Sequence, residues 1–216
     1  MNFKDGLRKD FLEYTRRAYQ TISGIAKPAI LDVGCGSGVP TMELARLSSG
    51  HIVAVDTDRT SLNELKRKIE SSRLSTHIEI IQCSLFDMCF KNECFDIIWA
   101  EGSINVIGFE RGLSEWRRYL RPSGFIVIHD ESGDLSDKIK QISACKYNLL
   151  DHFILAEDIW QQNYFAPLEK YISTNYQVQA DGTESGELVE QDRRFVAEFK
   201  QYPTRFRSAF FIMRRS

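Results

Sequence analysis

The sequence predicts an α/β protein in which helices cover both faces of a parallel sheet. Short apolar strands alternate with helical segments along the chain, and such alternation is typical of parallel sheets with helical crossovers. One apolar strand runs directly into a glycine-rich turn, and ligands bind beside such turns at the carboxyl edge of open parallel sheets. No linker rich in Pro, Gly or Ser divides the 216 residues, so we expect a single domain.

An amphipathic helix is expected before the first strand, over residues 4 to 22. Apolar side chains recur there at steps of three and four from Phe3 to Ile22, which is the spacing of one helix face. Gly24 is expected to end this helix. We interpret residues 1–24 as a lid over the ligand site.

The first strand, residues 29 to 33, ends in a turn with glycine at positions 34, 36 and 38. Glycine accepts a positive φ and has no Cβ, so the backbone of this turn can lie against a ligand. Asp32 interrupts the apolar run at the end of the strand where ligands bind. A dinucleotide fingerprint, G-x-G-x-x-G, would place its third glycine at position 39, where the chain has Val39. This spacing argues against NAD as the ligand.

The second strand, residues 51 to 56, ends in an acidic residue, Asp56. A carboxylate about 20 residues after the central glycine of the turn accepts hydrogen bonds from ribose hydroxyls in Rossmann-type sites. Asp56 stands at that distance from Gly36. The alternative role for Asp56 is the N-cap of the next helix, but Asp58 or Thr60 is better placed for it.

The acidic residue and the G-x-G-x-G turn of residues 32–38 resemble the first motif of the class I S-adenosylmethionine-dependent methyltransferases. The helix, Arg-Pro-Ser-Gly turn and strand of residues 109–130 are similar to an element of the ubiquinone and menaquinone type of small-molecule methyltransferase. The resemblance covers residues 28–130, the expected cofactor-binding core. It implies a Rossmann-like seven-stranded sheet, mostly parallel, with an antiparallel last strand. Residues 131–216 would then supply substrate-side helices and closing strands.

The same resemblance implies S-adenosylmethionine as the cofactor and S-adenosylhomocysteine as its product. The residues it places around the cofactor are Asp32, Gly34, Cys35, Gly36, Gly38, Asp56, Thr57, Ser84, Leu85, Ala100 and Glu101. Ser84 departs from the family, in which an acidic residue usually binds adenine, although a hydroxyl can still bond to the adenine edge. Asp87 is an alternative adenine ligand and could equally cap the following turn.

The remaining elements follow from short apolar runs. Pro40 suits the first turn of a helix that continues to Ser48. Further strands are expected at residues 77–82, 95–100, 124–129, 150–156 and 206–213.

Two titratable residues are candidates for catalysis. Glu101 follows the fourth strand, which in the resembled family ends beside the methyl group. His129 lies at the carboxyl edge of the next strand, and its ordinary pKa near 6.5 suits a general base. The alternative for both residues is a structural hydrogen-bonding role.

Aromatic residues before Pro167 could form the wall of a substrate pocket. Aromatic faces attract sulfonium cations and exclude water. We therefore expect Tyr14, Trp160 and Tyr164 to line this pocket, although part of the cluster also belongs to the core.

Composition limits the partners and the compartment. The net charge of −2 gives no bulk attraction to nucleic acid or anionic membrane. No apolar run approaches the length of a membrane span, and the first ten residues lack the apolar segment of a signal peptide. The five cysteines form no C-x-x-C motif, so we expect no metal site and a cytoplasmic location. A monomer or homodimer is expected.

These observations favour a methyltransferase that moves a methyl group to an O, N or C atom of a small molecule. The fourth strand does not end in an Asn-Pro-Pro-Tyr sequence, which argues against DNA as the substrate. The alternatives are a methyltransferase of protein or RNA and a non-catalytic protein that binds S-adenosylmethionine. A nicotinamide enzyme is a more distant possibility.

Overall fold

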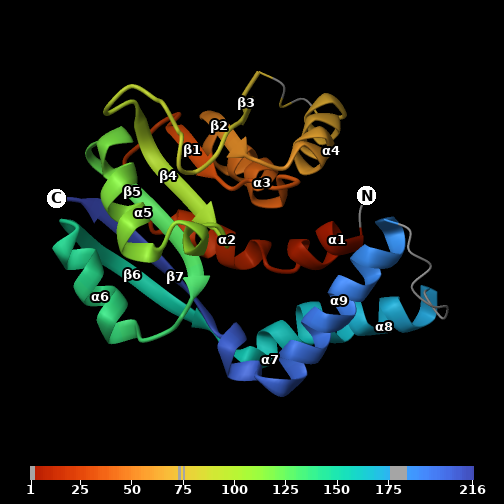
Figure 1. Ribbon diagram of the computed structural model, residues 1–216. Coiled ribbons are helices and arrows are strands. Elements are labelled where there is room, and N and C mark those ends of the chain that lie inside the picture. Colours follow the sequence, from red (N-terminus) through yellow and green to blue (C-terminus); the bar gives the residue numbers. More distant parts are fainter. Residues whose placement is uncertain (1–2, 73, 75, 176–183) are drawn as a thin grey trace.

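A seven-stranded sheet forms the centre of the protein, with the strand order β3-β2-β1-β4-β5-β7-β6 (Figure 1). The computed structural model describes residues 3–72, 74, 76–175 and 184–216. Within the order β3-β2-β1-β4-β5, each strand pairs in parallel with its neighbour, whereas β7 is antiparallel to both β5 and β6. The predicted sheet, mostly parallel with an antiparallel last strand, is confirmed. The strands are β1 (Ala29–Val33), β2 (His51–Asp56), β3 (Ile78–Gln82), β4 (Phe95–Glu101), β5 (Leu120–Glu131), β6 (Tyr147–Leu155) and β7 (Ser208–Arg215).

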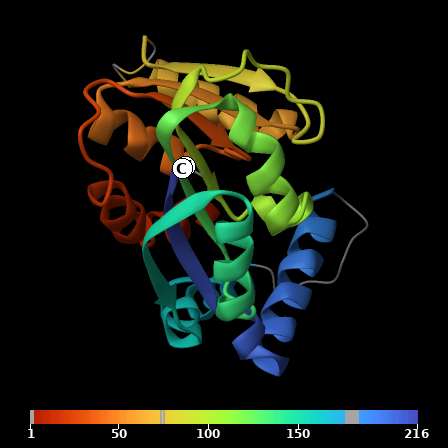
Figure 2. The ribbon, with the colours of Figure 1, turned by 90° about the vertical axis from the view of Figure 1, so that its left-hand side faces the viewer.

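Helices cover both faces of the sheet, as the alternation of elements predicts. One apolar cluster joins the sheet to α1, α2, α3, α4, α8 and α9, and the other joins it to α5 and α6. Figure 2 shows α5 and α6 on the side of the sheet nearest the viewer. The α-helices are α1 (Phe3–Lys9), α2 (Leu12–Gln20), α3 (Val39–Ser48), α4 (Arg59–Glu70), α5 (Phe109–Trp116), α6 (Leu135–Ala144), α7 (Glu157–Trp160), α8 (Ala166–Asn175) and α9 (Glu184–Gln201).

Short helical turns complete the chain, and one of them is a π-helix. The 3₁₀ turns are η1 (Ile104–Val106), η2 (Arg117–Tyr119) and η4 (Pro203–Phe206). The π-helical turn η3 (Gln161–Phe165) lies directly between α7 and α8. Such turns occur frequently at functional sites.

The two helices beside the glycine-rich turn begin where the sequence predicts. Pro40 lies in the first turn of α3, where its missing N–H is not needed. The Asp58 side chain accepts hydrogen bonds from the backbone N–H groups of Thr60 and Ser61 and so caps α4. Asp58, and not Asp56, is therefore the N-cap.

The single N-terminal helix expected over residues 4–22 is wrong, because the chain forms two helices, α1 and α2. The backbone N–H groups of Asp10 and Phe11 bond to the carbonyls of Leu7 and Arg8, three residues earlier, which breaks the α-helical ladder. Leu7 and Phe11 keep their helical spacing and are both buried, so the apolar pattern does not reveal the break. The predicted lid segment and the C-terminal region also include residues 1–2 and 176–183, which lie outside the described residues.

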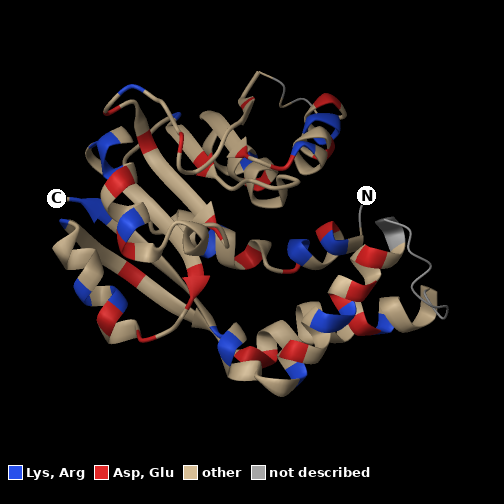
Figure 3. Ribbon diagram, viewed as in Figure 1, with Lys and Arg blue, Asp and Glu red and all other residues tan. Residues whose placement is uncertain are grey.

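Several strand boundaries differ from the prediction. β5 begins at Leu120, earlier than the expected residue 124, because Leu120 pairs with Phe95 across an irregularity in the ladder. β7 begins at Ser208, because residues 203–206 form a 3₁₀ turn. Acidic and basic residues are interspersed over the elements (Figure 3). Within the described residues, no helix has the length and apolarity needed to cross a membrane.

Candidate functional site

The glycine-rich turn between β1 and α3 has a left-handed backbone at all three glycines. The φ angles of Gly34, Gly36 and Gly38 are 74°, 51° and 78°. A Cβ on Gly34 would lie 2.3 Å from the Cβ of Ser103. A Cβ on Gly38 would lie 2.2 Å from Cδ1 of Leu65. Packing thus requires glycine at position 34, a Cβ at position 38 would force the end of the Leu65 side chain to move, and the space above Gly36 is more open.

Asp56 at the end of β2 is joined directly to this turn. Its Oδ2 accepts the backbone N–H of Gly36 at 2.8 Å, and its Oδ1 accepts that of Asp58 at 2.9 Å. Each carboxylate oxygen has a second lone pair, so both can accept a further hydrogen bond. The side chain is half-buried. The arrangement therefore presents a fixed carboxylate beside the glycine turn.

Asp32 and Cys35 lie beneath the turn and are buried. The Thr41 hydroxyl donates to Oδ2 of Asp32 at 2.6 Å. Burial raises the pKa of Asp32 to about 7, against the lowering effect of the Thr41 hydrogen bond. Burial, together with the negative charges of Asp32 and Asp56, also raises the pKa of the Cys35 thiol. Cys35 therefore stays a neutral packing residue.

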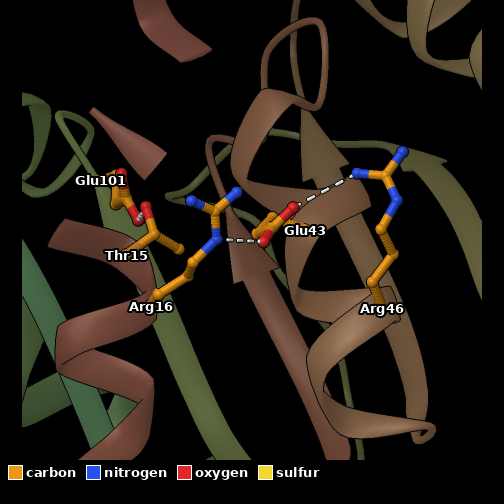
Figure 4. Close-up of polar contacts among 5 residues, drawn as sticks. All are labelled: Thr15, Arg16, Glu43, Arg46 and Glu101. Atoms are coloured by element: carbon orange, nitrogen blue, oxygen red, sulfur yellow. Dashed lines mark hydrogen bonds and ion pairs between the residues drawn. The ribbon is translucent and has the colours of Figure 1, made fainter. Parts of the chain in front are cut away.

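Glu101 at the end of β4 contacts both its own strand and helix α2. Its Oε1 accepts hydrogen bonds from Trp99 Nε1 at 2.7 Å and from the Thr15 hydroxyl at 2.9 Å. Figure 4 shows Thr15 and Glu101 facing each other. Burial raises the pKa of Glu101 to about 7, the two donors lower it, Asp32 raises it and Arg8 lowers it. Glu101 therefore changes charge near neutral pH.

Arg8 of α1 was not expected at this site. Its Nη1 lies 3.5 Å from the position that a Cβ on Gly36 would occupy. Its positive charge lowers the pKa values of Glu101 and Tyr164, so its guanidinium lies within electrostatic reach of both. The site thus brings the positive charge of Arg8 near the carboxylate of Glu101.

A second N-terminal residue, Asp5, ties α1 to the turn. Ser37 Oγ donates to Asp5 Oδ1 at 2.5 Å, and Lys68 Nζ of α4 lies 2.6 Å from Asp5 Oδ2. Lys68 also donates to the backbone carbonyl of Ser37 at 2.6 Å. Asp5 is only 2% exposed. Helix α1, the glycine turn and α4 therefore meet at an ion pair between the buried Asp5 and the partly exposed Lys68.

Ser84 and Leu85, which are expected near adenine, follow β3, whereas the expected cofactor residues Thr57 and Ala100 lie after β2 and within β4. The Ser84 hydroxyl accepts the backbone N–H of Phe86 at 3.2 Å, so it is already part of a turn. Leu85 packs partly against the apolar cluster on the α5 side. The side chain of Thr57 is exposed, and its carbonyl accepts from Gln82 at 3.0 Å. Ala100 is fully buried within the same α5-side cluster.

His129 lies in a buried stack away from solvent. Its Nε2 is 2.8 Å from the hydroxyl of Ser208, and its ring stacks on Phe210 with 4.3 Å between centroids. Burial, with a further contribution from Lys138, lowers the pKa of His129 to about 3. This geometry gives His129 a packing role, and a role as general base stays a prediction.

The three aromatic residues expected at the substrate pocket belong to one cluster around Phe11. Ring centroids lie 4.6 Å apart for Phe11 and Trp160, and 6.2 Å apart for Phe11 and Tyr14. Tyr164, on the π-helical turn, lies 6.0 Å from Trp160 and is buried. None of the three lines the cavity of about 920 Å³ between residues 131–136 and residues 195–207. Within the described part of the chain, no group of His, Cys, Asp or Glu side chains could hold a metal ion.

The chain is similar in sequence to known methyltransferases. Residues 30–124 match the family model described as a methyltransferase domain. The chain is 28% identical over 117 residues to "Methyltransferase GfsG" of Streptomyces halstedii, covering 54% of this chain and 42% of that protein. It is 25% identical over 143 residues to "Ubiquinone/menaquinone biosynthesis C-methyltransferase UbiE" of Vibrio vulnificus, covering 63% and 55%. The match thus spans about half the length of these relatives.

A solved structure extends the likeness to the whole fold. The structure of the "[4+2]-Cyclase SpnF" superposes with a TM-score of 0.79 at 18% identity, covering 94% of this chain and 80% of that one. The SAM-dependent methyltransferase from Thiobacillus denitrificans, solved with S-adenosylhomocysteine, superposes with a TM-score of 0.73 at 15% identity, covering 94% of this chain and 91% of that one. Residues 30–124 are therefore similar to a methyltransferase domain, within a chain whose fold is like that of solved S-adenosylmethionine-dependent methyltransferases.

Proposed function

We propose that this protein transfers the methyl group of S-adenosylmethionine to an O, N or C atom of a small molecule, in a single domain. The observation that carries the proposal is the glycine turn fixed against Asp56. Three left-handed glycines bring the backbone close to the ligand, and the Asp56 carboxylate can accept both ribose hydroxyls. Thr57, Ser84, Leu85 and Ala100 are assigned to the adenosine side.

Arg8 and Glu101 are assigned to the amino-acid end of the cofactor. The methionyl group carries a carboxylate and an ammonium. The Arg8 guanidinium beside Gly36 is suited to the carboxylate. Glu101, when ionised, is suited to the ammonium. The opposite charges at this end of the turn therefore fit a zwitterion.

The bound cofactor supplies a methyl group that is already activated by its sulfonium. The protein then has to align the acceptor, exclude water and, where the acceptor loses a proton, accept that proton. Where Glu101 faces the acceptor instead of the ammonium, it is our candidate base, because its pKa of about 7 lets it accept a proton at neutral pH. His129, which pairs with Glu101 across β4 and β5, is assigned a packing role beside this carboxylate.

The acceptor is assigned to the aromatic cluster of Tyr14, Trp160 and Tyr164. These rings offer apolar faces next to α1 and α2, which supports a small, partly apolar acceptor. The five free cysteines support a reducing, cytoplasmic location. We propose a monomer or homodimer that acts without DNA or a membrane. A protein or RNA acceptor, or binding without methyl transfer, remains the alternative.

Calorimetric titration tests the cofactor assignment. S-adenosylmethionine and S-adenosylhomocysteine are expected to bind with micromolar affinity, and NAD is expected not to bind. Transfer of tritiated methyl from labelled cofactor to a fraction of small metabolites then separates an enzyme from a binding protein. Label in a protein or RNA fraction alone would overturn the small-molecule assignment.

A matched ligand tests the role of Arg8. 5′-Methylthioadenosine contains the nucleoside but no amino-acid group. Arg8→Ala is expected to weaken S-adenosylhomocysteine about tenfold or more, because a charge-assisted hydrogen bond is lost, and to leave methylthioadenosine unchanged. Equal weakening of both ligands would contradict the assignment of Arg8 to the carboxylate.

A further inference from the structure

One oxygen of Glu101 accepts two hydrogen bonds, one from its own strand β4 and one from helix α2. Trp99, two residues earlier, belongs to the same central strand and therefore donates whenever the sheet is formed. Thr15 stands 86 residues away on α2 and donates only when that helix is docked. Thr15 is 1% exposed, so its hydroxyl has no water as an alternative partner.

The residue next to Thr15 holds the same helix to α3. Arg16 Nε lies 2.6 Å from Glu43 Oε1, and Arg46 Nη1 lies 3.3 Å from Glu43 Oε2 (Figure 4). Two consecutive residues of α2 thus contact carboxylates on β4 and on α3. Because Glu43 keeps Arg46 as a partner, Arg16 can be replaced without leaving a buried carboxylate unpaired.

The charge of Glu101 depends on groups from every element around it. Asp32 of β1 and burial favour its neutral form, whereas Arg8 of α1, Trp99 and Thr15 favour the carboxylate. His129, which pairs with Glu101 across β4 and β5, stays neutral because burial lowers its pKa. The opposing effects leave the pKa of Glu101 at about 7. The loss of a single donor therefore changes the charge of Glu101 at neutral pH.

We infer that Thr15 is a positioning residue whose hydroxyl, carried to the end of β4 by α2, sets the orientation and ionisation of Glu101 through its hydrogen bond. When α2 is docked, the hydroxyl fixes the carboxylate and stabilises its charged form. When the hydroxyl alone is removed and α2 stays docked, Glu101 keeps only the Trp99 donor in a buried site and takes up a proton more readily. The functional consequence, that the N-terminal helices complete the acidic part of the site, rests on the proposed function of Glu101.

Three variants separate the hydrogen bond from the docking of the helix. Thr15→Val keeps the shape and removes the donor, Thr15→Ser keeps the donor, and Arg16→Gln loosens α2 at the neighbouring position. The measurement is the pH titration of the Glu101 carboxyl carbon by ¹³C NMR, in protein without ligand. The signal is assigned by its absence in Glu101→Gln, and its pKa separates it from ordinary glutamates.

Thr15→Val is expected to raise the titration midpoint of Glu101 by about one pH unit, as expected for losing a donor to a charged group. In Thr15→Ser and in Arg16→Gln, the Glu101 carboxyl is expected to titrate with the same midpoint as in the unchanged protein. As a second readout, the fall of S-adenosylhomocysteine affinity on acidification should begin at a correspondingly higher pH in Thr15→Val. Thr15→Ala makes the same comparison if the valine variant does not fold.

An unchanged midpoint in Thr15→Val would overturn the inference. An equal shift in Arg16→Gln would also overturn it, because loosening of the helix would then suffice. The titration needs no cofactor, so its failure is distinct from failure of the proposed function, which shows as absent ligand binding.

Discussion

Asp56 is the single side chain on which the nucleoside contacts depend most. Asp56→Ala removes the expected ribose acceptors and the partner of the Gly36 amide. We expect the dissociation constant of S-adenosylhomocysteine to rise about 100-fold, because about 2–3 kcal/mol is typical of a lost charged partner. Calorimetry measures this change.

Asp58→Ala is the matched control for Asp56. It removes the cap of α4 and should cost about 1 kcal/mol of unfolding free energy, yet leave the affinity unchanged. Unaltered affinity in Asp56→Ala would remove Asp56 from the ribose site.

Gly34 illustrates how packing, as well as backbone conformation, selects glycine. Gly34→Ala is strained by its φ of 74° and by a Cβ placed 2.3 Å from that of Ser103. Gly102 has a similar φ of 71° but open space around it, so Gly102→Ala carries the conformational cost alone. We expect Gly102→Ala to lower the unfolding free energy by about 1–2 kcal/mol. Gly34→Ala should lower it clearly more.

Unfolding in urea measures both free energies. Ser103→Gly removes the opposing Cβ and also the hydrogen bond from the Ser103 hydroxyl to the Val33 carbonyl. Measured within that background, Gly34→Ala should carry only the conformational cost. If both alanine variants lost equal stability, the contact with Ser103 would not be what requires glycine at position 34.

At the scale of elements, the ion pair between the buried Asp5 and the partly exposed Lys68 holds α1 on the glycine turn. Asp5→Ala leaves the Lys68 ammonium, which is 27% exposed, without its carboxylate partner. We expect the unfolding free energy to fall by about 2 kcal/mol or more and backbone amides of α1 to exchange faster with deuterium. Asp10→Ala, an exposed carboxylate in the same segment, should change little. Unchanged exchange in Asp5→Ala would show that other contacts hold α1.

The elements that the sequence predicted well carry local signals. Pro40 marks the start of α3 and Asp58 that of α4, because first-turn proline and N-cap chemistry act within a few residues. The break between α1 and α2 carries no such signal. Leu7 and Phe11 are four residues apart, so the apolar spacing continues across it.

The residues of the candidate site also fall into those with a sequence signal and those without one. Gly36 and Asp56 were predictable because each follows a strand, and parallel strands bring their carboxyl ends together. Asp5 and Arg8 were missed, since charged residues on an amphipathic helix usually face water and only tertiary packing brings α1 to the turn. Thr15 had one available signal, because it occupies a position of the apolar face between Phe11 and Ala18.

At the scale of the whole molecule, three buried titratable groups make stability depend on pH in opposite directions. Burial raises the pKa values of Asp32 and Glu101 to about 7. Between their unfolded pKa values and pH 7, these groups hold protons in the folded state that the unfolded chain releases. Their contribution therefore stabilises the protein as the pH falls through 7.

His129 acts in the opposite direction, because burial lowers its pKa from 6.5 to about 3. Below pH 6.5 the unfolded chain binds a proton that the folded protein does not, so stability is lost as the pH falls from 6.5 toward 3. One such proton corresponds to about 1.4 kcal/mol per pH unit. His129→Asn removes this proton uptake. Relative to the unchanged protein, the variant should therefore gain about that much per unit on acidification from pH 6 to pH 4.

Urea unfolding at several pH values measures these slopes, which count protons and so are insensitive to any constant packing cost of the substitution. His152→Asn is the control for the histidine-to-asparagine change itself, because His152 is exposed on β6. A His129→Asn slope equal to that of the unchanged protein would mean that His129 is charged in the folded state. The buried stack between Ser208 and Phe210 would then have to hold an imidazolium, which its apolar surroundings disfavour.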